Sequence, residues 1–334
     1  MAYTTIDDSS AYFQNKIYSG TGNSLALTFD GNSDMQPDWV WFKRRDGAAN
    51  HHAYTSTTGV TAALVPNDTD VEATGSLEAT NYFTSFNSNG FTLASGNYNN
   101  SNKANQTYAS WNWKETADAG FDIITFTGNG SGRTISHSLG VKPTFYVVKN
   151  RDRATSWVVY HKMMGANYIA GLFNDASVSE STSGAFNNTE PTSSVLSIGS
   201  SHGTNSNGEK IICYAFADKQ GYSKFGSYEG NGNADGAFIY TGFKPALVWI
   251  KNTDSGQNWV MFDSKRPGFN VTNDYMHLNT ADAETDENSL DLLSNGFKIR
   301  SSGTDRNGSG NKLIFFAWAK NPFVTSTGIP GTAQ

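Results

Sequence analysis

The chain has 334 residues, of which 37% are hydrophobic, 13% aromatic and 16% charged, and its formal net charge is −6. This length allows one large domain or several small ones, each with its own core. The net negative charge, together with no Lys/Arg run longer than residues 43–45, excludes an extended basic surface for nucleic acid.

The first fifteen residues contain Asp7 and Asp8 and no apolar core segment. We therefore expect no secretory signal peptide there, and we assign residues 1–15 to a short docking arm. No run of eighteen apolar residues occurs in the chain, so no membrane-spanning helix is expected. The single cysteine, Cys213, lies in the apolar run IICYAF and is interpreted as a small buried side chain.

One motif occurs three times along the chain. The segment QPDWVWFKRRD at 36–46 returns as KPTFYVVKNRD at 142–152 and as KPALVWIKNTD at 244–254. Each copy places a lysine six positions after a proline and an aspartate three positions later. A period near one hundred residues indicates tandem domains, because solenoid repeats are shorter. The repeat anchors are Pro37, Lys43, Asp46, Pro143, Lys149, Asp152, Pro245, Lys251 and Asp254.

An aromatic-x-Gly-x-Gly unit precedes each anchor motif, and an aromatic run (YASWNWK, ICYAFADK or FFAWAK) follows it. These markers set the expected boundaries of three modules of about one hundred residues each. The modules are residues 16–120, 121–223 and 224–323, and a C-terminal tail follows at 324–334.

The anchor motifs contain four consecutive apolar residues at 39–42, 145–148 and 247–250. A half-exposed strand alternates with a period of two, so this pattern predicts a strand covered on both faces. We expect one face to lie on the core of its module and the other on a neighbouring module or subunit.

Other segments, such as SWVVYHK and GFKIRS, are typical of strands with one wet face, and glycine-rich turns separate them. Residues 71–86 and 283–294 could each form a short helix. The predicted fold is all-β, with three tandem β-sandwich or jelly-roll modules.

The anchor residues are interpreted as structural. Proline is expected at the start of the strand, where its missing N–H breaks no ladder bond. Lysine and aspartate follow just after the strand, where they could form an ion pair or where the aspartate could close an Asx turn.

The acidic loop Asp282, Glu284, Asp286 and Glu287 could bind calcium, but its spacing fits no EF-hand, and a solvated loop or helix N-terminus is favoured. Its partial echo, residues 68–72, contains Asp68, Asp70 and Glu72.

The remaining patterns favour no catalytic chemistry. The Gly-x-Gly units precede a proline and a strand rather than a helix, so they are expected to form turns and not a nucleotide site. His51 and His52 are adjacent, and neighbours on a strand point to opposite faces, which makes a poor metal site. No catalytic residue, metal or cofactor is expected, and the ligand-binding residues are unknown. The loop aromatics that could stack on sugars are Tyr98, Tyr168, Phe173, Phe186 and Tyr275.

The opening AYTTIDDSSAYFQNKIYSGTG, the phrase FDGNSDMQPDWVWFKRRD, the module pattern YEGNGNADGAFIYTGFKPALVWIKNTD and the closing AWAKNPFVTSTGIPGTAQ carry a family likeness. They resemble tandem β-module virion proteins of marine tailed bacteriophages, which are tail-fibre-like. This resemblance implies a concanavalin-like or jelly-roll sandwich, a homo-oligomer such as a trimer, and a place on the virion surface. The chain departs from typical fibres, since it has no coiled-coil heptads and no β-helix period.

We therefore expect a non-enzymatic virion structural protein, most simply a tail fibre or receptor-binding component that contacts a host surface glycan or receptor. Its arm or tail would dock to other virion proteins, and no nucleic acid or membrane insertion is expected. A head decoration or head-fibre protein is the alternative within this class. An enzyme that degrades surface polysaccharide is the alternative of another class, and a secreted lectin or adhesin is less favoured for want of a signal peptide.

Overall fold

The computed structural model describes residues 3–74, 82–172, 174–181, 184–267 and 270–331. Strands dominate this part of the chain, and its helices are single turns. They are η1 (Ser9–Ala11), α2 (His202–Asn205) and α3 (Thr304–Asn307). The predicted all-β fold is therefore confirmed. No helix within the described residues is long and apolar enough to cross a membrane.

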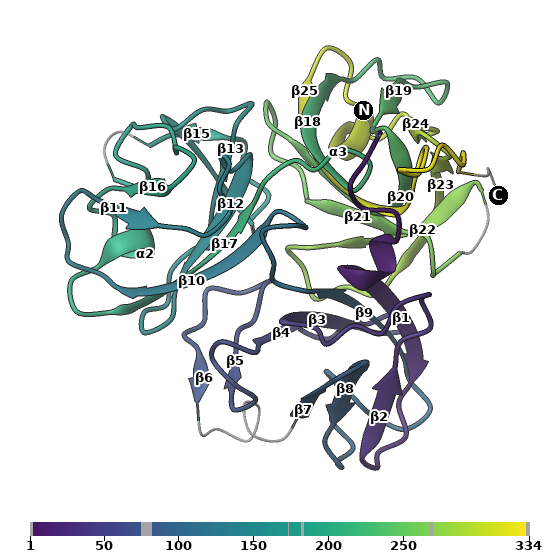
Figure 1. Ribbon diagram of the computed structural model, residues 1–334, viewed down its shortest axis with the longest axis horizontal. Coiled ribbons are helices and arrows are strands. Elements are labelled where there is room, and N and C mark those ends of the chain that lie inside the picture. The colour runs from purple at the N-terminus through teal and green to yellow at the C-terminus, as the bar shows by residue number, and fades with distance from the viewer. Residues whose placement is uncertain (1–2, 75–81, 173, 182–183, 268–269, 332–334) are drawn as a thin grey trace.

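The first repeat, residues 16–120, forms a β-sandwich (Figure 1). Its strands are β1 (Phe13–Ser19), β2 (Leu25–Thr28), β3 (Trp39–Arg44), β4 (His52–Thr55), β5 (Ala62–Ala63), β6 (Ala73–Thr74), β7 (Phe83–Asn87), β8 (Gly90–Leu93) and β9 (Thr107–Trp113). One layer has the order β1-β9-β3-β4 and the other β2-β8-β7, with β5-β6 as a separate ribbon. Val40, Phe42 and Phe91 belong to the buried cluster that holds these layers together.

The second repeat, residues 121–223, has the same inner order of strands. Its strands are β10 (Phe121–Thr127), β11 (Arg133–Ser136), β12 (Phe145–Asn150), β13 (Val158–His161), β14 (Tyr168–Gly171), β15 (Ser179–Glu180), β16 (Val195–Ile198) and β17 (Lys210–Phe216). The larger sheet is ordered β10-β17-β12-β13-β14-β15, and β11-β16 form the second sheet. Tyr146, Val148 and Leu196 lie in the core of this repeat.

The third repeat, residues 224–323, is built from one continuous sheet. Its strands are β18 (Ser223–Glu229), β19 (Phe238–Tyr240), β20 (Phe243–Asn252), β21 (Val260–Asp263), β22 (Thr272–His277), β23 (Thr285–Leu293), β24 (Gly296–Ile299) and β25 (Lys312–Pro322). The order is β18-β25-β20-β21-β22-β23-β24-β19, and β20 touches both β23 and β24. The sheet therefore curls over on itself and encloses its own apolar interior.

The expected helix at 283–294 is wrong, and the one at 71–86 lies partly outside the described residues. Residues 285–293 form β23, whose Leu290 and Leu292 are buried opposite Ile299 and Phe297 of β24. Within 71–86, the described residues contain β6 and β7, and 75–81 lie outside the described part of the chain. In both segments the cross-strand partner, which lies outside the segment itself, decides the local structure.

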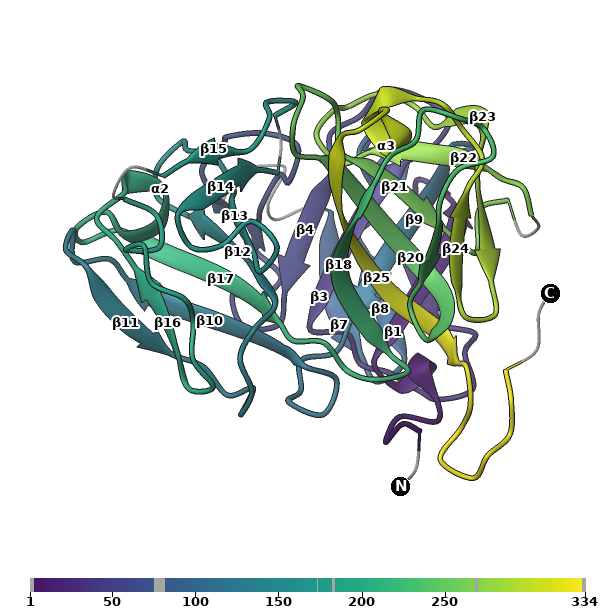
Figure 2. The same ribbon diagram turned by 90° about the horizontal axis from the view of Figure 1, so that it is seen from above.

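The three repeats appear as lobes around a common centre, and the anchor strands β3, β12 and β20 meet there (Figures 1 and 2). Alternate residues of β3 face different cores: Trp39 and Trp41 belong to the shared centre, whereas Val40 and Phe42 belong to the first repeat alone. The residues at 39–42 and 247–250 are all at most 1% exposed. The prediction of strands covered on both faces is thus confirmed, and the cover comes from the same chain.

Aromatic rings from all three repeats touch in this shared core. The Trp39 ring stacks on the Tyr214 ring with their centroids 4.4 Å apart, and the Trp113 ring meets the Trp318 ring edge-on with a centroid distance of 5.5 Å. Phe145 lies 4.7 Å from Phe316, also edge-on. Large aromatic side chains bury much apolar area, so this centre couples the stability of the three repeats.

The described part of the expected docking arm, residues 3–15, packs on the end of the second repeat, on the third repeat and on the tail. The Thr4 hydroxyl donates to Gln220 O (2.7 Å), and Tyr3 OH donates to Gly242 O (2.7 Å). Asp7 accepts a hydrogen bond from Ser326 N–H in the tail (2.5 Å), and β1 already begins at Phe13. The arm therefore meets the tail at Asp7 and Ser326, beside the third repeat.

Candidate functional site

The anchor prolines mark the entry of the central strands. Pro37 and Pro143 stand two residues before β3 and β12, as predicted. Pro245 differs, because β20 begins earlier, at Phe243, and its ladder with β25 shifts register around the proline. A bulge at this point accommodates a residue that has no N–H to donate.

The anchor aspartates do not pair with the anchor lysines, which corrects one sequence interpretation. Each aspartate instead accepts a hydrogen bond from the first residue of the closing strand of its repeat. Asp46 accepts from Thr107 N–H (3.0 Å), and Asp152 accepts from Lys210 N–H (2.7 Å). Asp254 accepts from Lys312 N–H at 2.8 Å. The Asx turns are made by the preceding asparagines, Asn150 and Asn252.

The anchor lysines are buried, and their ammonium groups donate hydrogen bonds to backbone carbonyl oxygens. Lys149 Nζ donates to Thr155 O in its own repeat and to Thr69 O in the first repeat, both at 2.9 Å. Lys251 Nζ likewise reaches Asp175 O of the second repeat (3.0 Å). Burial lowers the pKa of Lys43, Lys149 and Lys251 to about 8 in each case. Lys149 and Lys251 therefore tie one repeat to the next, whereas Lys43 donates to Arg44 O (2.6 Å) within its own repeat.

The contact between neighbouring repeats, here called a joint, is built alike at all three places. A backbone N–H of one repeat donates to the carbonyl eight residues after the anchor proline of another. The three bonds are Glu72 N to Arg151 O (2.8 Å), Val178 N to Thr253 O (3.0 Å) and Glu284 N to Arg45 O (2.8 Å). The third bond joins the last repeat to the first, which closes the ring.

The acidic loops carry two of these joints, so their expected role as solvated loops or helix N-termini is wrong for two residues. Glu72 pairs with both Arg151 Nε and Nη2 at 2.7 Å. Glu284 pairs with Arg45 (2.7 Å) and with the buried Arg266 (2.9 Å). Among the described residues, no group of three or more His, Cys, Asp or Glu side chains is arranged to hold a metal ion.

A ring N–H donor lies fourteen residues after each proline. The sequence shows it as tryptophan in the second and third repeats, and it was missed in the first because the residue type changes. Trp157 Nε1 donates to Val65 O (3.3 Å), and Trp259 Nε1 donates to Gly171 O (2.8 Å). The first repeat has His51 at this position, whose Nε2 lies 3.1 Å from Thr280 O. His51 Nδ1 accepts from Trp41 Nε1 (2.9 Å), which fixes a neutral imidazole with its proton on Nε2. His51 is thus a joint residue.

The Gly-x-Gly units form turns, as expected. In the second repeat, a Cβ on Gly128 would lie 2.0 Å from Ser206 O, and Gly130 has φ +71°. The buried Asn205 accepts from Asn129 N–H (3.0 Å) and donates to Gly199 O (2.7 Å). Asn102 and Asn307 make the matching hydrogen bonds in the other two repeats. The glycines therefore allow the turn to pack closely against the segment that carries this asparagine.

One carboxylate cluster lies at the joint of the first two repeats. Burial, and the neighbouring Asp122, raise the pKa of Glu115 to about 7. Glu115 Oε1 accepts from Ile123 N–H (2.9 Å), and Asp218 accepts from Phe225 N–H (2.8 Å) at the next joint. At both joints a carboxylate accepts a hydrogen bond from a backbone N–H of the next repeat, Glu115 at the first and Asp218 at the second. We therefore interpret the cluster around Glu115 as structural.

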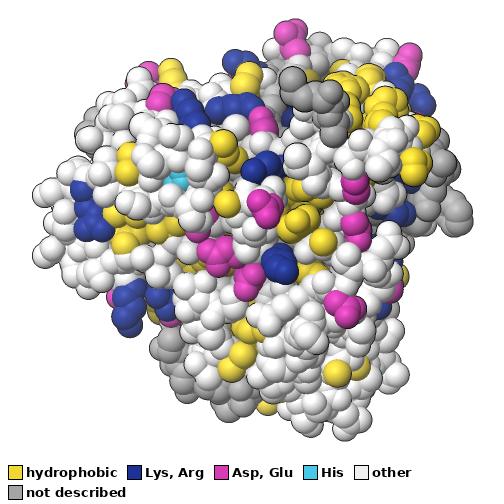
Figure 3. All heavy atoms as spheres, in the orientation of Figure 1, with side chains coloured by type: hydrophobic (Ala, Val, Ile, Leu, Met, Phe, Trp, Pro, Cys, Tyr) yellow, Lys and Arg dark blue, Asp and Glu magenta, His cyan; other side chains and the backbone are white. Residues whose placement is uncertain are grey.

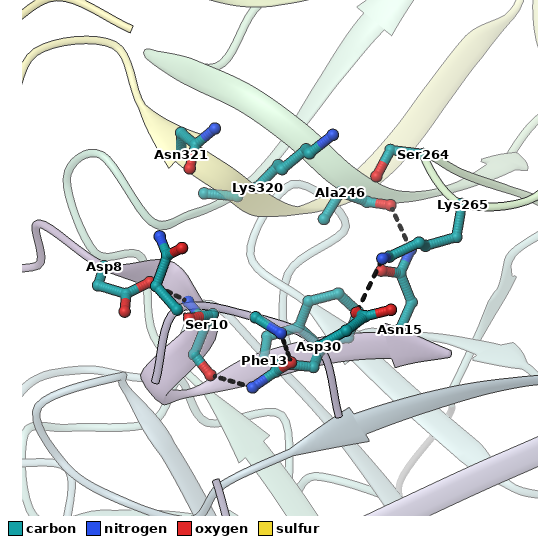
Figure 4. Close-up of a pocket in the computed structure, with 14 residues that line it drawn as sticks. Asp8, Ser10, Phe13, Asn15, Asp30, Ala246, Ser264, Lys265, Lys320 and Asn321 are labelled. Carbon is teal, nitrogen blue, oxygen red and sulfur yellow. Dashed lines mark hydrogen bonds and ion pairs between the residues drawn. The ribbon is translucent and has the colours of Figure 1, made fainter. Parts of the chain in front are cut away.

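A polar pocket of about 280 Å³ lies where the arm meets the third repeat (Figure 4). Polar side chains that line the pocket bond to each other. Lys265 Nζ pairs with Asp30 (2.8 Å), and Ser10 Oγ donates to Asp8 (2.6 Å). Asn15 Nδ2 donates to Ala246 O (3.3 Å) across the joint. The pocket is therefore part of the ring closure.

The five loop aromatics have different surroundings. Phe186 is fully buried, Tyr275 is 7% exposed, and Tyr98 packs on the Tyr82 ring at 4.9 Å. Tyr168 is 38% exposed, and Phe173 lies outside the described residues. Three of the five are therefore poor sugar platforms.

The exposed aromatics that sequence comparison missed are Phe238 and Tyr240 on β19, at 46% and 48% exposure. They border an open groove of about 390 Å³ between the third and second repeats. We call it the aromatic groove. β18 lines it, and Lys162 and Met163 line it from the second repeat. Hydrophobic side chains gather over the β19 and β24 end of the third repeat, with basic side chains beside them (Figure 3).

The other two repeats show that the fold does not require these aromatics. Register against the neighbouring strand places Ile239 of β19 at the position of Leu27 in β2 and of Ile135 in β11. All three are buried, and the residues on either side of each are exposed. Those exposed residues are Ala26 and Thr28 in the first repeat, Thr134 and Ser136 in the second, and Phe238 and Tyr240 in the third. The third repeat alone carries rings there.

The fold defines an all-β protein whose antiparallel sheets pack around a shared core, with the aromatic groove beside β19. The chain belongs to the family described as domain of unknown function DUF7483, whose model matches residues 8–322. No match was found among curated proteins.

Proposed function

We propose that this chain is a non-enzymatic structural protein of a bacteriophage virion, a tail fibre or receptor-binding component that contacts the host cell surface. The observation that carries the proposal is the pair of exposed aromatic rings on β19. The matching strands of the other two repeats carry no aromatic ring at these positions. Exposed rings cost solubility, and two other repeats form the same strand without them. In the third repeat the Tyr240 hydroxyl also lies 3.2 Å from the Tyr3 hydroxyl of the arm, whereas its ring stays half exposed. Such an exposed surface is typical of a binding site.

The ring of repeats supports a structural role. Three joints and a shared aromatic core hold the lobes in fixed positions, and a rigid scaffold presents a binding surface without an ordering cost. The sequence likeness to tandem β-module virion proteins supports a position on the particle surface. Contacts of the arm or tail to other virion proteins, and a homo-oligomer such as a trimer, belong to the same proposal.

Immunogold electron microscopy of purified phage particles, with an antibody raised against the whole chain, tests this proposal. Label at the tail is the expected result. Label on the capsid would favour the alternative, a head decoration or head-fibre protein. Particles without label, from a lysate in which the antibody detects the chain, would overturn the proposal.

Polysaccharide cleavage is the competing function of another class. It is tested by incubating the chain with host surface polysaccharide and measuring new reducing ends over time. We expect none, and sustained release of oligosaccharides would overturn the non-enzymatic part of the proposal.

A further inference from the structure

We infer that the aromatic groove binds an acidic saccharide, with the Phe238 and Tyr240 rings as stacking platforms and Lys224 as the partner of the negative group. This inference rests on the proposed function, since it names the chemistry of the surface that would be recognised.

The two rings are spaced for neighbouring units of a chain. Residues two apart on a strand point to the same face, about 7 Å from each other. Ile239 between them is buried and anchors the strand. Sugar rings have apolar faces that pack on aromatic rings, and their hydroxyls need polar groups alongside. Ser227 and Lys162 provide such groups within the groove.

At the floor of the groove a glycine makes room for the Phe315 ring. A Cβ on Gly226 would lie 2.8 Å from the Phe315 ring, which is buried beneath. The residue at the same strand position is Ile124 in the second repeat and Lys16 in the first, by pairing with the closing strands. The third repeat therefore has the added rings and, at this floor position, no side chain on β18.

The charge at the groove favours an anion. Lys224 Nζ lies 5.1 Å from the centre of the Tyr240 ring and donates to Tyr240 O (2.9 Å). Both of these contacts are to uncharged groups, whereas Lys162 pairs with Asp218 and Lys298, opposite Phe238, pairs with Asp235. A carboxylate or phosphate on a bound sugar would give Lys224 an ionic partner beside the stacking ring.

The exposed apolar area fits a saccharide better than a protein partner. Phe238, Tyr240 and Met163 are each less than half exposed. At that exposure they offer on the order of 300 Å². A stable protein interface buries roughly 800 Å² on each partner. The groove volume, by contrast, lies in the range of small-ligand sites.

The test is isothermal titration calorimetry of the whole chain with oligogalacturonate, a carboxylate-bearing saccharide, and with its methyl ester as the neutral counterpart. We expect binding of the acid form that weakens with added salt, and weaker binding of the ester. The double variant Phe238→Thr/Tyr240→Ser places the second repeat's residues in β19, so it keeps residues that this fold accepts. It should lose about tenfold in affinity.

Two further variants sharpen the test. Lys224→Gln should weaken binding of the acid form more than binding of the ester, because the ester has no negative group to lose its ionic partner. Val141→Thr, at another exposed apolar residue of 43% exposure, should change neither. Equal binding by the double variant and the unchanged chain would overturn the inference, as would no binding of either saccharide. A mass that rises with concentration and falls in the double variant would assign the groove to a second copy instead.

These outcomes are separable from those of virion labelling. A labelled tail without saccharide binding would reject the groove chemistry alone. Saccharide binding by a chain that is missing from virions would reject the proposed function alone.

Discussion

Replacing Asp263 with alanine is expected to lower the free energy of unfolding by about 3–5 kcal/mol. Asp263 and Arg266 have side chains only 1% and 0% exposed, and Arg266 Nε donates to Asp263 Oδ2 (2.6 Å). The same carboxylate accepts from Trp111 Nε1 of the first repeat (3.0 Å). Its loss leaves a buried guanidinium short of one partner and an indole N–H without an acceptor, and both are costly.

Urea unfolding followed by tryptophan fluorescence measures this change. The matched control is Asp235→Ala, because Asp235 also pairs with a basic residue, Lys298 (2.8 Å), but its side chain is 79% exposed. An exposed pair of this kind contributes about 0–1 kcal/mol. Equal losses of unfolding free energy in the two variants would contradict the prediction. They would show that buried Asp263, with its bonds to Arg266 and to Trp111 of the first repeat, stabilises the fold no more than an exposed ion pair does.

Acid is expected to destabilise the protein through its buried histidines. Burial lowers the pKa of His52 from its ordinary 6.5 to about 4 and that of His161 to about 3. Their neutral forms are favoured in the fold, so their contribution is fully present above pH 6.5. It is lost as the pH falls towards the folded pKa, because the unfolded chain takes up the protons first. For each residue the full loss is on the order of 3–5 kcal/mol.

The His161→Leu variant isolates this effect from the acid response of the carboxylates. Below pH 6.5 its unfolding free energy should fall less steeply than that of the unchanged chain, although it is less stable at pH 7. His202→Gln, at an exposed histidine, should leave the slope unchanged. Parallel pH profiles for all three proteins between pH 6.5 and 4 would contradict the prediction, because His161 would then not titrate with folding.

The strands of the shared core were predictable from sequence because burial on both faces leaves four apolar residues in a row. The roles of Lys149, Lys251 and Glu72 were not predictable, because each has a partner in another repeat, and the same holds for Glu284. Sequence spacing reports contacts within one strand or turn, and it carries no record of which distant carbonyl solvates Lys149.

The aromatic groove escaped sequence comparison for a geometric reason. The buried residue that aligns the three outer strands, at 27, 135 and 239, lies ten, eight and six residues before the anchor proline. No fixed offset therefore reveals that Phe238 and Tyr240 replace small residues. The pairing of β19 with β24 sets the register, and only the fold supplies it. His51 was missed differently, since an imidazole and an indole donate the same N–H from unlike residues.

The central claim is that the three repeats close into one ring around a shared core and so form a single cooperative scaffold for the groove. Differential scanning calorimetry of the whole chain tests it most directly. We expect one transition whose calorimetric enthalpy equals the van't Hoff enthalpy, because Trp39, Phe145 and Trp318 pack in one cluster. Two or three separate transitions, each with the enthalpy of a single repeat, would contradict it.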